Sequence, residues 1–333
     1  MIFLMLTLLL WGAASVTAQE IRDGKLHIGD NAYTIGDFGA AGIWMTENLR
    51  EIPGYGQKMV VTGNMVNTGK INSLIPVDLR GAGSKIDNVE RSGVIIAGGL
   101  LVDAGTTLNN DGEITITQGP QPSHGTDPTA KYYNYPAVAI GDPDTTSAKY
   151  GYLYSWAAAT NITSSITTED GNNSSQPQVQ GICPSGWHLP SDYEWTLLEK
   201  EIAMNATNDY SSLGANAAAD TTGMATAMPP SIRVGTPPSL DMKMRAATKT
   251  WLASGTFITG DSHPAEDGGF WVLPAGNWGS ELTPAGFGTG AYFWTSSSHG
   301  SQAYRRQLYG TNPGIERRGS PKYASFSVRC KKN

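Results

Sequence analysis

The most regular pattern of apolar and polar positions follows Ser191. Three residues later stands Glu194, the spacing of a capping box, which predicts a helix that begins at Asp192. Apolar side chains then recur at helical spacing between charged ones, at Trp195, Leu198 and Ile202. Such a stripe has to be buried, so we expect this helix to pack against the core.

Between residues 59 and 125 the pattern changes to short β-branched runs. The runs are separated by Gly, Asn and Asp and show no helical period. This pattern predicts a β-rich insertion, with a small separate β subdomain as the alternative. The flanking residues 19–58 and 126–333 would then form one domain around it.

The chain beyond residue 250 is rich in aromatic residues and glycine. Aromatic side chains set among turn residues are typical of short strands that cross a compact core. Ser325–Cys330 alternates like a half-buried strand, and Tyr150–Ala159 predicts a short helix. Residues 205–240 lack any period and predict a long surface excursion.

Composition and termini favour an exported globular protein. With 39% hydrophobic residues the chain can bury a core, and a net charge of −6 argues against nucleic acid as a partner. Residues 1–18 are typical of a secretory signal peptide and too short for a membrane span, although no Lys or Arg precedes the apolar run, which leaves a displaced start codon open. Cys183 and Cys330 are most simply one disulfide, the alternative being two buried thiols.

Several motifs follow one another in a familiar order: WMTENLR, YGYLYSW, CPSGWHLPSDYEWTLLE, FWVLPAG, YFWTSSS and SVRCKK. In this order they resemble the Fibrobacter succinogenes major paralogous domain, a family of exported bacterial domains similar to C-type lectins and formylglycine-generating enzymes. The resemblance covers residues 30–58 and 130–331. It implies an α+β, C-type lectin-like fold, with short strands around two helices and with 59–125 as a β-rich insertion.

The resemblance also implies roles for single residues. Cys183 and Cys330 would form the disulfide of the family, and Trp44 and Asn48 would lie on an early strand and turn. The residues that we expect to build the scaffold are Trp44, Trp156, Trp187, Ser191, Glu194, Trp195 and Trp294.

Motifs of catalysis and of metal binding are missing from the sequence. Its five histidines form no HxH or HExxH pair, and there is neither a GxSxG motif nor a phosphate-binding glycine loop. Formylglycine-generating enzymes need a reactive cysteine pair near the C-terminus, where this chain has only Cys330. The calcium-binding triplets of C-type lectins do not occur either. We expect no catalytic residue and no cofactor, with a structural calcium at the acidic residues of 142–144 or 266–267 as the alternative.

Candidate ligand-binding residues lie between Ser296 and Lys322. This segment is rich in Tyr, Arg, Ser, Gly and Asn and poor in aliphatic residues, a composition favoured on adaptable binding faces. We predict a binding face lined by His299, Tyr304, Arg306, Tyr309, Arg317 and Arg318. The alternative is a solvated strand and loop whose arginines only pair with nearby acids.

The function expected from these patterns is that of an exported binding module, at the cell surface or secreted, in a Gram-negative bacterium. Its partner would be an extracellular glycan or protein, as for an adhesin. Two alternatives stay open: a structural component of a surface assembly such as a pilus tip, and a divergent enzyme of the formylglycine-generating type.

Overall fold

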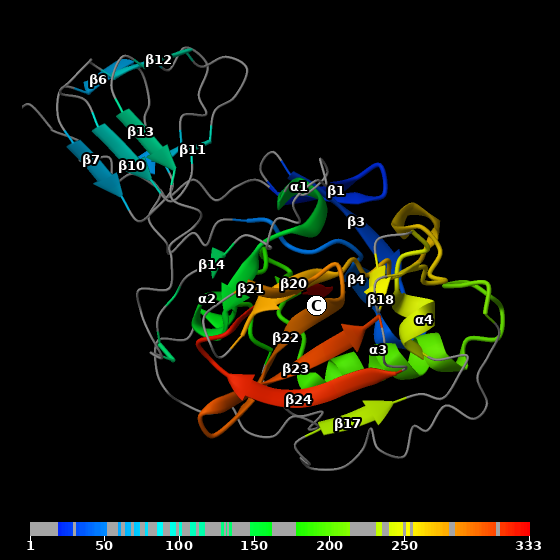
Figure 1. The fold of residues 1–333 in the computed structure, drawn as a ribbon. Helices are drawn as coiled ribbons and strands as arrows, with labels where there is room; N and C mark the ends of the chain where they lie inside the picture. The colour runs from blue at the N-terminus through cyan, green and yellow to red at the C-terminus, as the bar shows by residue number, and fades with distance from the viewer. Residues whose placement is uncertain are drawn as a thin grey trace, which may run out of the picture.

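The computed structural model describes nine short strands between residues 59 and 116 and, outside them, residues 19–28, 31–51, 128–129, 131, 133–134, 147–161, 178–213, 231–234, 240–248, 251–253, 256–279, 284–310 and 314–333. The signal sequence expected for residues 1–18 and most of the excursion expected for 205–240 lie outside these residues. Within them the protein is rich in strands and has few helices (Figure 1). None of the described helices is long and apolar enough to cross a membrane.

The first and the last described strands share one six-stranded sheet. In sheet order its strands are β1 (Gln19–Arg22), β2 (Lys25–Ile28), β3 (Asn31–Asp37), β4 (Ile43–Met45), β26 (Lys331–Lys332) and β16 (Trp187–His188). Asp23 and Gly24, between β1 and β2, have positive φ angles of 51° and 71°, as a type I′ hairpin turn requires. Lys331 of β26 pairs with Trp44 of β4, so the two ends of the described chain are joined by backbone hydrogen bonding.

A larger sheet forms the centre of the molecule. Its strands run in the order β14 (Tyr133–Asn134), β15 (Leu153–Ser155), β25 (Ser325–Phe326), β20 (Ala275–Trp278), β22 (Gly290–His299), β23 (Gln302–Tyr309), β24 (Ile315–Pro321) and β17 (Ser231–Val234), and β21 (Pro284–Phe287) pairs with β20. The long antiparallel strands β22, β23 and β24 lie side by side (Figure 1). The strands expected beyond residue 250 are therefore present, and they position the site described below.

The helices are short except for one, and the capping box marks the start of that one. The described helical segments are η1 (Gly39–Ala41), α1 (Ser147–Tyr150), α2 (Trp156–Thr160), α3 (Asp192–Met204), α4 (Leu240–Met244) and η3 (Ala265–Asp267), and a separate hairpin joins β18 (Trp251–Ala253) to β19 (Thr256–Ile258). Ser191 Oγ accepts the amide of Glu194 and the Glu194 side chain accepts the amide of Ser191, as predicted.

The helix predicted over Tyr150–Ala159 is wrong in its first part. Leu153–Ser155 forms strand β15, and α2 begins only at Trp156. Ser155 ends the strand and caps the helix, because its hydroxyl accepts the amide of Ala158 at 3.2 Å. A helical pattern and a strand of three residues cannot be told apart by periodicity at this length.

Apolar clusters cover both faces of the central sheet. Alternate residues of β22 enter different clusters: Tyr292 and Trp294 belong to one, and Ala291 and Phe293 to the other. The second cluster also contains Trp195 of α3, so this helix covers that face. The five scaffold tryptophans are buried as expected: Trp44, Trp156, Trp187, Trp195 and Trp294.

One disulfide links the entry of α3 to the end of the chain. Cys183 and Cys330 are bonded, with their Cα atoms 5.8 Å apart and 147 positions between them in sequence. Both lie in the same apolar cluster as Trp187 and Trp294. The pairing implied by the family resemblance is thus present.

The nine strands between 59 and 116 form three parallel sheets of three strands each. Each sheet takes one strand from each third of the stretch: β5 (Met59–Val60), β8 (Val77–Asp78) and β11 (Leu100–Leu101); β6 (Asn64–Asn67), β9 (Lys85–Asn88) and β12 (Thr107–Asn110); β7 (Lys70–Ser73), β10 (Val94–Ala97) and β13 (Glu113–Ile116). This is the strand order of a three-coil β-solenoid. The expected β-rich character is present, and the coiled repeat was not foreseen.

Both ends of this stretch are attached to one residue of the central sheet. Tyr154 of β15 pairs with Tyr133 of β14, which follows the solenoid strands, and its hydroxyl donates to the carbonyl of Glu51, which precedes them, at 2.7 Å. The chain segments before and after the solenoid strands therefore lie next to each other, at Tyr154.

Candidate functional site

Neighbouring side chains of β23 point to opposite faces of the central sheet. Leu308 enters the apolar cluster that contains α3, and Arg306 and Tyr304 follow it on that face at intervals of two residues. Arg305 and Tyr309 lie on the other face, where they line a cavity. The sheet thus carries two different polar environments back to back.

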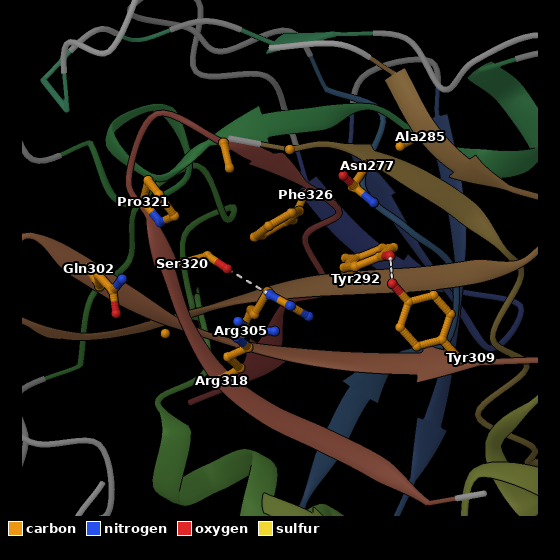
Figure 2. Close-up of a pocket in the computed structure, with 13 residues that line it drawn as sticks. Asn277, Ala285, Tyr292, Gln302, Arg305, Tyr309, Arg318, Ser320, Pro321 and Phe326 are labelled. Carbon is orange, nitrogen blue, oxygen red and sulfur yellow. Dashed lines mark hydrogen bonds between the residues drawn. The ribbon is translucent and has the colours of Figure 1, made fainter. Parts of the chain in front are cut away.

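The cavity lies on the face of the sheet away from α3 (Figure 2). It has a volume of about 490 Å³, within the usual range for small-molecule sites. Strands β20 to β25 supply its walls, and its polar and aromatic lining comprises Asn277, Tyr292, Gln302, Arg305, Tyr309, Arg318, Ser320 and Phe326. Cations, amides and phenols dominate this lining, and no carboxylate is among them.

Arg305 is the most unusual group of the cavity, because it is buried and lacks an ion pair. Only 7% of the residue is exposed. Nε donates to Ser320 Oγ at 2.7 Å and Nη1 donates to Gln307, whereas Nη2 makes no hydrogen bond with the residues that the structure describes. No described carboxylate lies within ion-pair distance of it. Burial lowers the pKa of Arg305, which reports the cost of holding this charge away from water.

Aromatic rings hold the Arg305 guanidinium in place. Its central carbon lies 5.1 Å from the ring centre of Tyr292 and 5.6 Å from that of Phe326, within the range of cation–π attraction. The hydroxyl of Tyr292 donates to that of Tyr309 at 2.6 Å (Figure 2). Burial, and then this hydrogen bond, raise the pKa of Tyr292, so the phenol keeps its proton at neutral pH.

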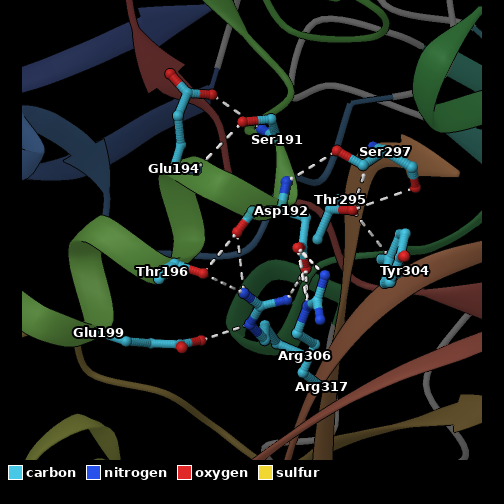
Figure 3. Close-up of polar contacts among 10 residues, drawn as sticks. All are labelled: Ser191, Asp192, Glu194, Thr196, Glu199, Thr295, Ser297, Tyr304, Arg306 and Arg317. Carbon is cyan, nitrogen blue, oxygen red and sulfur yellow. Dashed lines mark hydrogen bonds and ion pairs between the residues drawn. The ribbon is translucent and has the colours of Figure 1, made fainter. Parts of the chain in front are cut away.

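On the opposite face, Arg306 joins the sheet to α3 through buried ion pairs (Figure 3). Its Nη1 pairs with Asp192, its Nε lies 2.5 Å from Glu199 Oε1, and its Nη2 donates to Thr196 Oγ1 at 3.1 Å. Arg317 donates from Nε to Asp192 Oδ2 at 2.8 Å. All three nitrogens of Arg306 are bonded, so this network is closed.

The ion pairs also shift the pKa values of the charged groups in the network. Burial alone would lower the pKa of Arg306, but Asp192 and Glu199 outweigh it and raise that pKa above its usual value. Burial raises the pKa of Glu199, although Arg306 opposes the shift. The network therefore depends on complete pairing rather than on solvent.

The family model of the Fibrobacter succinogenes major domain matches residues 39–332. This chain belongs to the Fibrobacter succinogenes major domain family. Comparison with curated proteins found no match, and neither did comparison with solved structures. Both the cavity and the ion-pair network lie within the family domain.

Three of the residues predicted to line a binding face are buried inside this family domain. Tyr304, Arg306 and Arg317 are exposed by 1%, 0% and 5%, and they face α3. The prediction for these three is wrong because side chains alternate between the two faces of the sheet along β23 and β24. Residues two and four positions from Leu308 and Ile315 lie on the same face as these two, toward α3. The arginines on that face pair with acids, as in the alternative interpretation.

The remaining predicted residues have different outcomes. Tyr309 and Arg318 do line the cavity of the family domain. His299 ends β22, opposite Gln302, and its side chain lies outside the described residues. Arg305 was missed, although counting by twos from the apolar Leu308 would have placed it on the other face.

A second, smaller cavity of about 260 Å³ also contains a buried arginine, but the nitrogens of that arginine have partners within the protein. Arg329 lines it and is buried too, and burial lowers its pKa to about 9. Its nitrogens are already used, however, since they donate to Asn48 Oδ1 (2.9 Å), to the carbonyl of Phe270 and to that of Trp271 (3.1 Å). This arginine therefore stabilises the chain at Trp271, which has a positive φ of 50°.

Metal-binding side chains do not cluster among the residues that the structure describes: no three of His, Cys, Asp and Glu converge there. Of the acidic pairs considered for calcium, Glu266 and Asp267 lie in η3, and residues 142–144 lie outside the described ranges. His188 is buried between Glu194 and Asn333, with Nε2 2.9 Å from Glu194 Oε1.

Proposed function

We propose that this chain is an exported binding module, acting at the surface of a Gram-negative bacterium or secreted from it, which holds part of a glycan or protein in the cavity beside Arg305. The observation that carries the proposal is the burial of Arg305 against a cavity without a described carboxylate partner. A buried, unpaired charge costs stability, and a ligand with a complementary group would recover that cost on binding.

We propose a C-type lectin-like arrangement for the β-rich fold and binding in place of catalysis. Short strands surround α2 and α3, and the first and last strands of the described chain lie in one sheet, in which β4 pairs with β26; both features support the lectin-like arrangement. Binding in place of catalysis is supported by the cysteines, because both are in the disulfide and neither offers a reactive thiol. The disulfide also supports export, since disulfides persist in oxidising compartments.

The proposed binding needs no cofactor. The cavity offers guanidinium, amide and phenol groups, whereas a calcium-dependent sugar site needs several carboxylate and carbonyl oxygens around the ion. Direct hydrogen bonds from the protein to the ligand would replace such coordination.

A glycan array probed with the purified protein tests the proposal. We expect a restricted set of glycans to retain the protein, and we expect Arg305→Gln and Tyr309→Ala to lose it. Arg22→Gln is the matched control, because it removes the same charge from an exposed position on β1. Retention of no glycan, or equal retention of Arg305→Gln, would argue against the cavity as the binding site.

The solenoid strands favour a second candidate function, assembly with other copies. Strands β5 to β7 at one end and β11 to β13 at the other pair on one side only among the described residues. Unpaired strand edges can accept a further strand, so end-to-end stacking of coils would build a surface fibre. Deletion of residues 59–116 should then abolish concentration-dependent association in light scattering and leave glycan binding intact. A wild-type protein that stays monomeric at high concentration would remove this candidate.

A further inference from the structure

We infer that the ligand held beside Arg305 is a sugar that carries a carboxylate, such as a hexuronate. The inference rests on the proposed function and narrows its ligand class. Three properties of the cavity support it: the free edge of a buried guanidinium, the small net charge around that guanidinium, and a lining suited to hydroxyl groups.

The unbonded Nη2 side of the Arg305 guanidinium is suited to binding a planar anion. Nε and Nη1 donate to Ser320 and Gln307, and the rings of Tyr292 and Phe326 lie 5.1 and 5.6 Å from the central carbon of the guanidinium. Nη2 has no described partner within the protein. A guanidinium fork matches a carboxylate in shape, and hydrogen bonds between two ionised groups are about twice as strong as neutral ones.

The charges around the fork favour one negative charge in the ligand. Arg318 stands at the rim, with its side chain 54% exposed, and its Nη1 lies 3.9 Å from Glu316 Oε1. Glu316 also acts on Arg305 through its charge. Two guanidinium groups and one carboxylate leave a single positive charge, which suits a monoanionic carboxylate better than a dianionic phosphate.

The rest of the lining fits a sugar ring. The amides of Asn277 and Gln302 and the hydroxyl of Tyr309 can exchange hydrogen bonds with ring hydroxyls, and Phe326 adds apolar surface to the lining. A peptide terminus fits less well, because peptides usually add to a free strand edge, and β23 is paired on both sides, with β22 and with β24.

Isothermal titration with a matched pair of small sugars tests the inference. Methyl β-D-glucuronide and its methyl ester differ only in charge and one methyl group. We expect the acid to bind about 10 to 100 times more tightly than the ester, because charge-assisted hydrogen bonds exceed neutral ones by that margin. N-acetylneuraminate offers the same chemistry from another source, and its affinity relative to the glucuronide would identify which sugar acid fits the cavity.

Variants locate the effect. Arg305→Gln should bind the acid and the ester equally, whereas Arg22→Gln, which removes a charge on β1, should keep the preference of the wild type. Arg305→Lys retains the charge without the planar fork and should recover only part of the preference. The unfolding midpoint of each variant, measured in denaturant, separates a lost contact from a lost fold.

The outcomes separate this inference from the proposed function. Equal affinity of wild type for the acid and the ester, with loss of both in Tyr309→Ala, would overturn the acidic ligand and keep sugar binding at the cavity. Equal affinity for acetyl-glycyl-glycine and the glucuronide would overturn the sugar in favour of a peptide terminus. Absence of binding to every sugar and to acetyl-glycyl-glycine at millimolar concentration would overturn both proposals together.

Discussion

Arg305 and Arg306 are adjacent in sequence and have opposite surroundings. Arg306 is enclosed by Asp192, Glu199 and Thr196, and each of its nitrogens is bonded. Arg305, on the other face of the same strand, has no described carboxylate partner and faces a cavity. The difference shows that the role of an arginine in this segment follows from the face of the strand on which it lies.

The two faces also differ in what their charges do for stability. A closed buried network holds α3 to the sheet, and removing one member leaves the others unpaired and without water. An unpaired buried cation instead lowers the stability of the free protein, and it contributes favourable free energy only when a ligand binds to it. Replacing Arg306 and replacing Arg305 should therefore change the free energy of unfolding by amounts that differ in both size and sign.

The largest effect should come from Arg306→Met. This change leaves Glu199 buried without its cation and leaves Asp192 with Arg317 alone, so we expect the free energy of unfolding to fall by about 3–5 kcal/mol. Guanidinium denaturation followed by tryptophan fluorescence measures it. A loss below about 1 kcal/mol would show that the network contributes little, and would remove the contrast between the faces.

Removal of the disulfide should have the next largest effect. Cys183 and Cys330 belong to the apolar cluster on the cavity side, where no ion-pair network replaces them. We expect the double change to Ser to cost about 2–4 kcal/mol, because the bond closes a long loop in the unfolded chain. Thermal unfolding of the variant should match that of reduced wild type. Equal stability with and without reductant would contradict this role.

Acid should weaken the start of α3 through Glu194. Burial alone would raise its pKa, but hydrogen bonds from His188 and Lys331 outweigh burial and lower the pKa to about 2 from its usual 4.5. A lowered folded pKa means that this stabilisation is complete above pH 4.5 and is lost as the pH falls toward 2. We expect a loss of up to about 3 kcal/mol over that window. Glu194→Gln should flatten the pH dependence, and an unchanged slope would contradict the assignment.

The smallest effect should come from Arg305→Met. Replacing an unpaired buried cation by an apolar group removes a desolvation cost, so we expect the free energy of unfolding to change by less than about 1 kcal/mol or to rise. The same denaturation experiment as for Arg306→Met makes the comparison direct. A loss above about 2 kcal/mol would assign Arg305 to the scaffold.

Short-range signals in the sequence predicted the scaffold well. The capping box at Ser191 and Glu194 depends on residues three positions apart, so the helix start could be predicted without tertiary information. The disulfide followed from the presence of two cysteines in a chain expected to be exported, and the family resemblance implies the same pairing. The early helix was placed too far toward the N-terminus, because Leu153–Ser155 pairs with β25, a contact that local sequence does not contain.

Long-range pairing explains what sequence did not predict. Part of the segment 296–322 lines the cavity, but the predicted binding residues were assigned without regard to the alternation that sends Arg305 and Arg306 to different faces. The solenoid was missed for a similar reason. Asn67, Asn88 and Asn110 lie in register in neighbouring coils, yet they are unequally spaced in sequence. The sequence therefore has no fixed repeat length from which the coils could be predicted.

The attachment of both solenoid ends at Tyr154 has an evolutionary consequence. Because Glu51 and Tyr133 meet at that residue, the chain between them can be lengthened or shortened without moving the central sheet. Duplication of one coil would add one strand to each of the three parallel sheets and leave both attachment points unchanged. Selection can thus alter the reach of the coils and the chemistry of the cavity independently of each other.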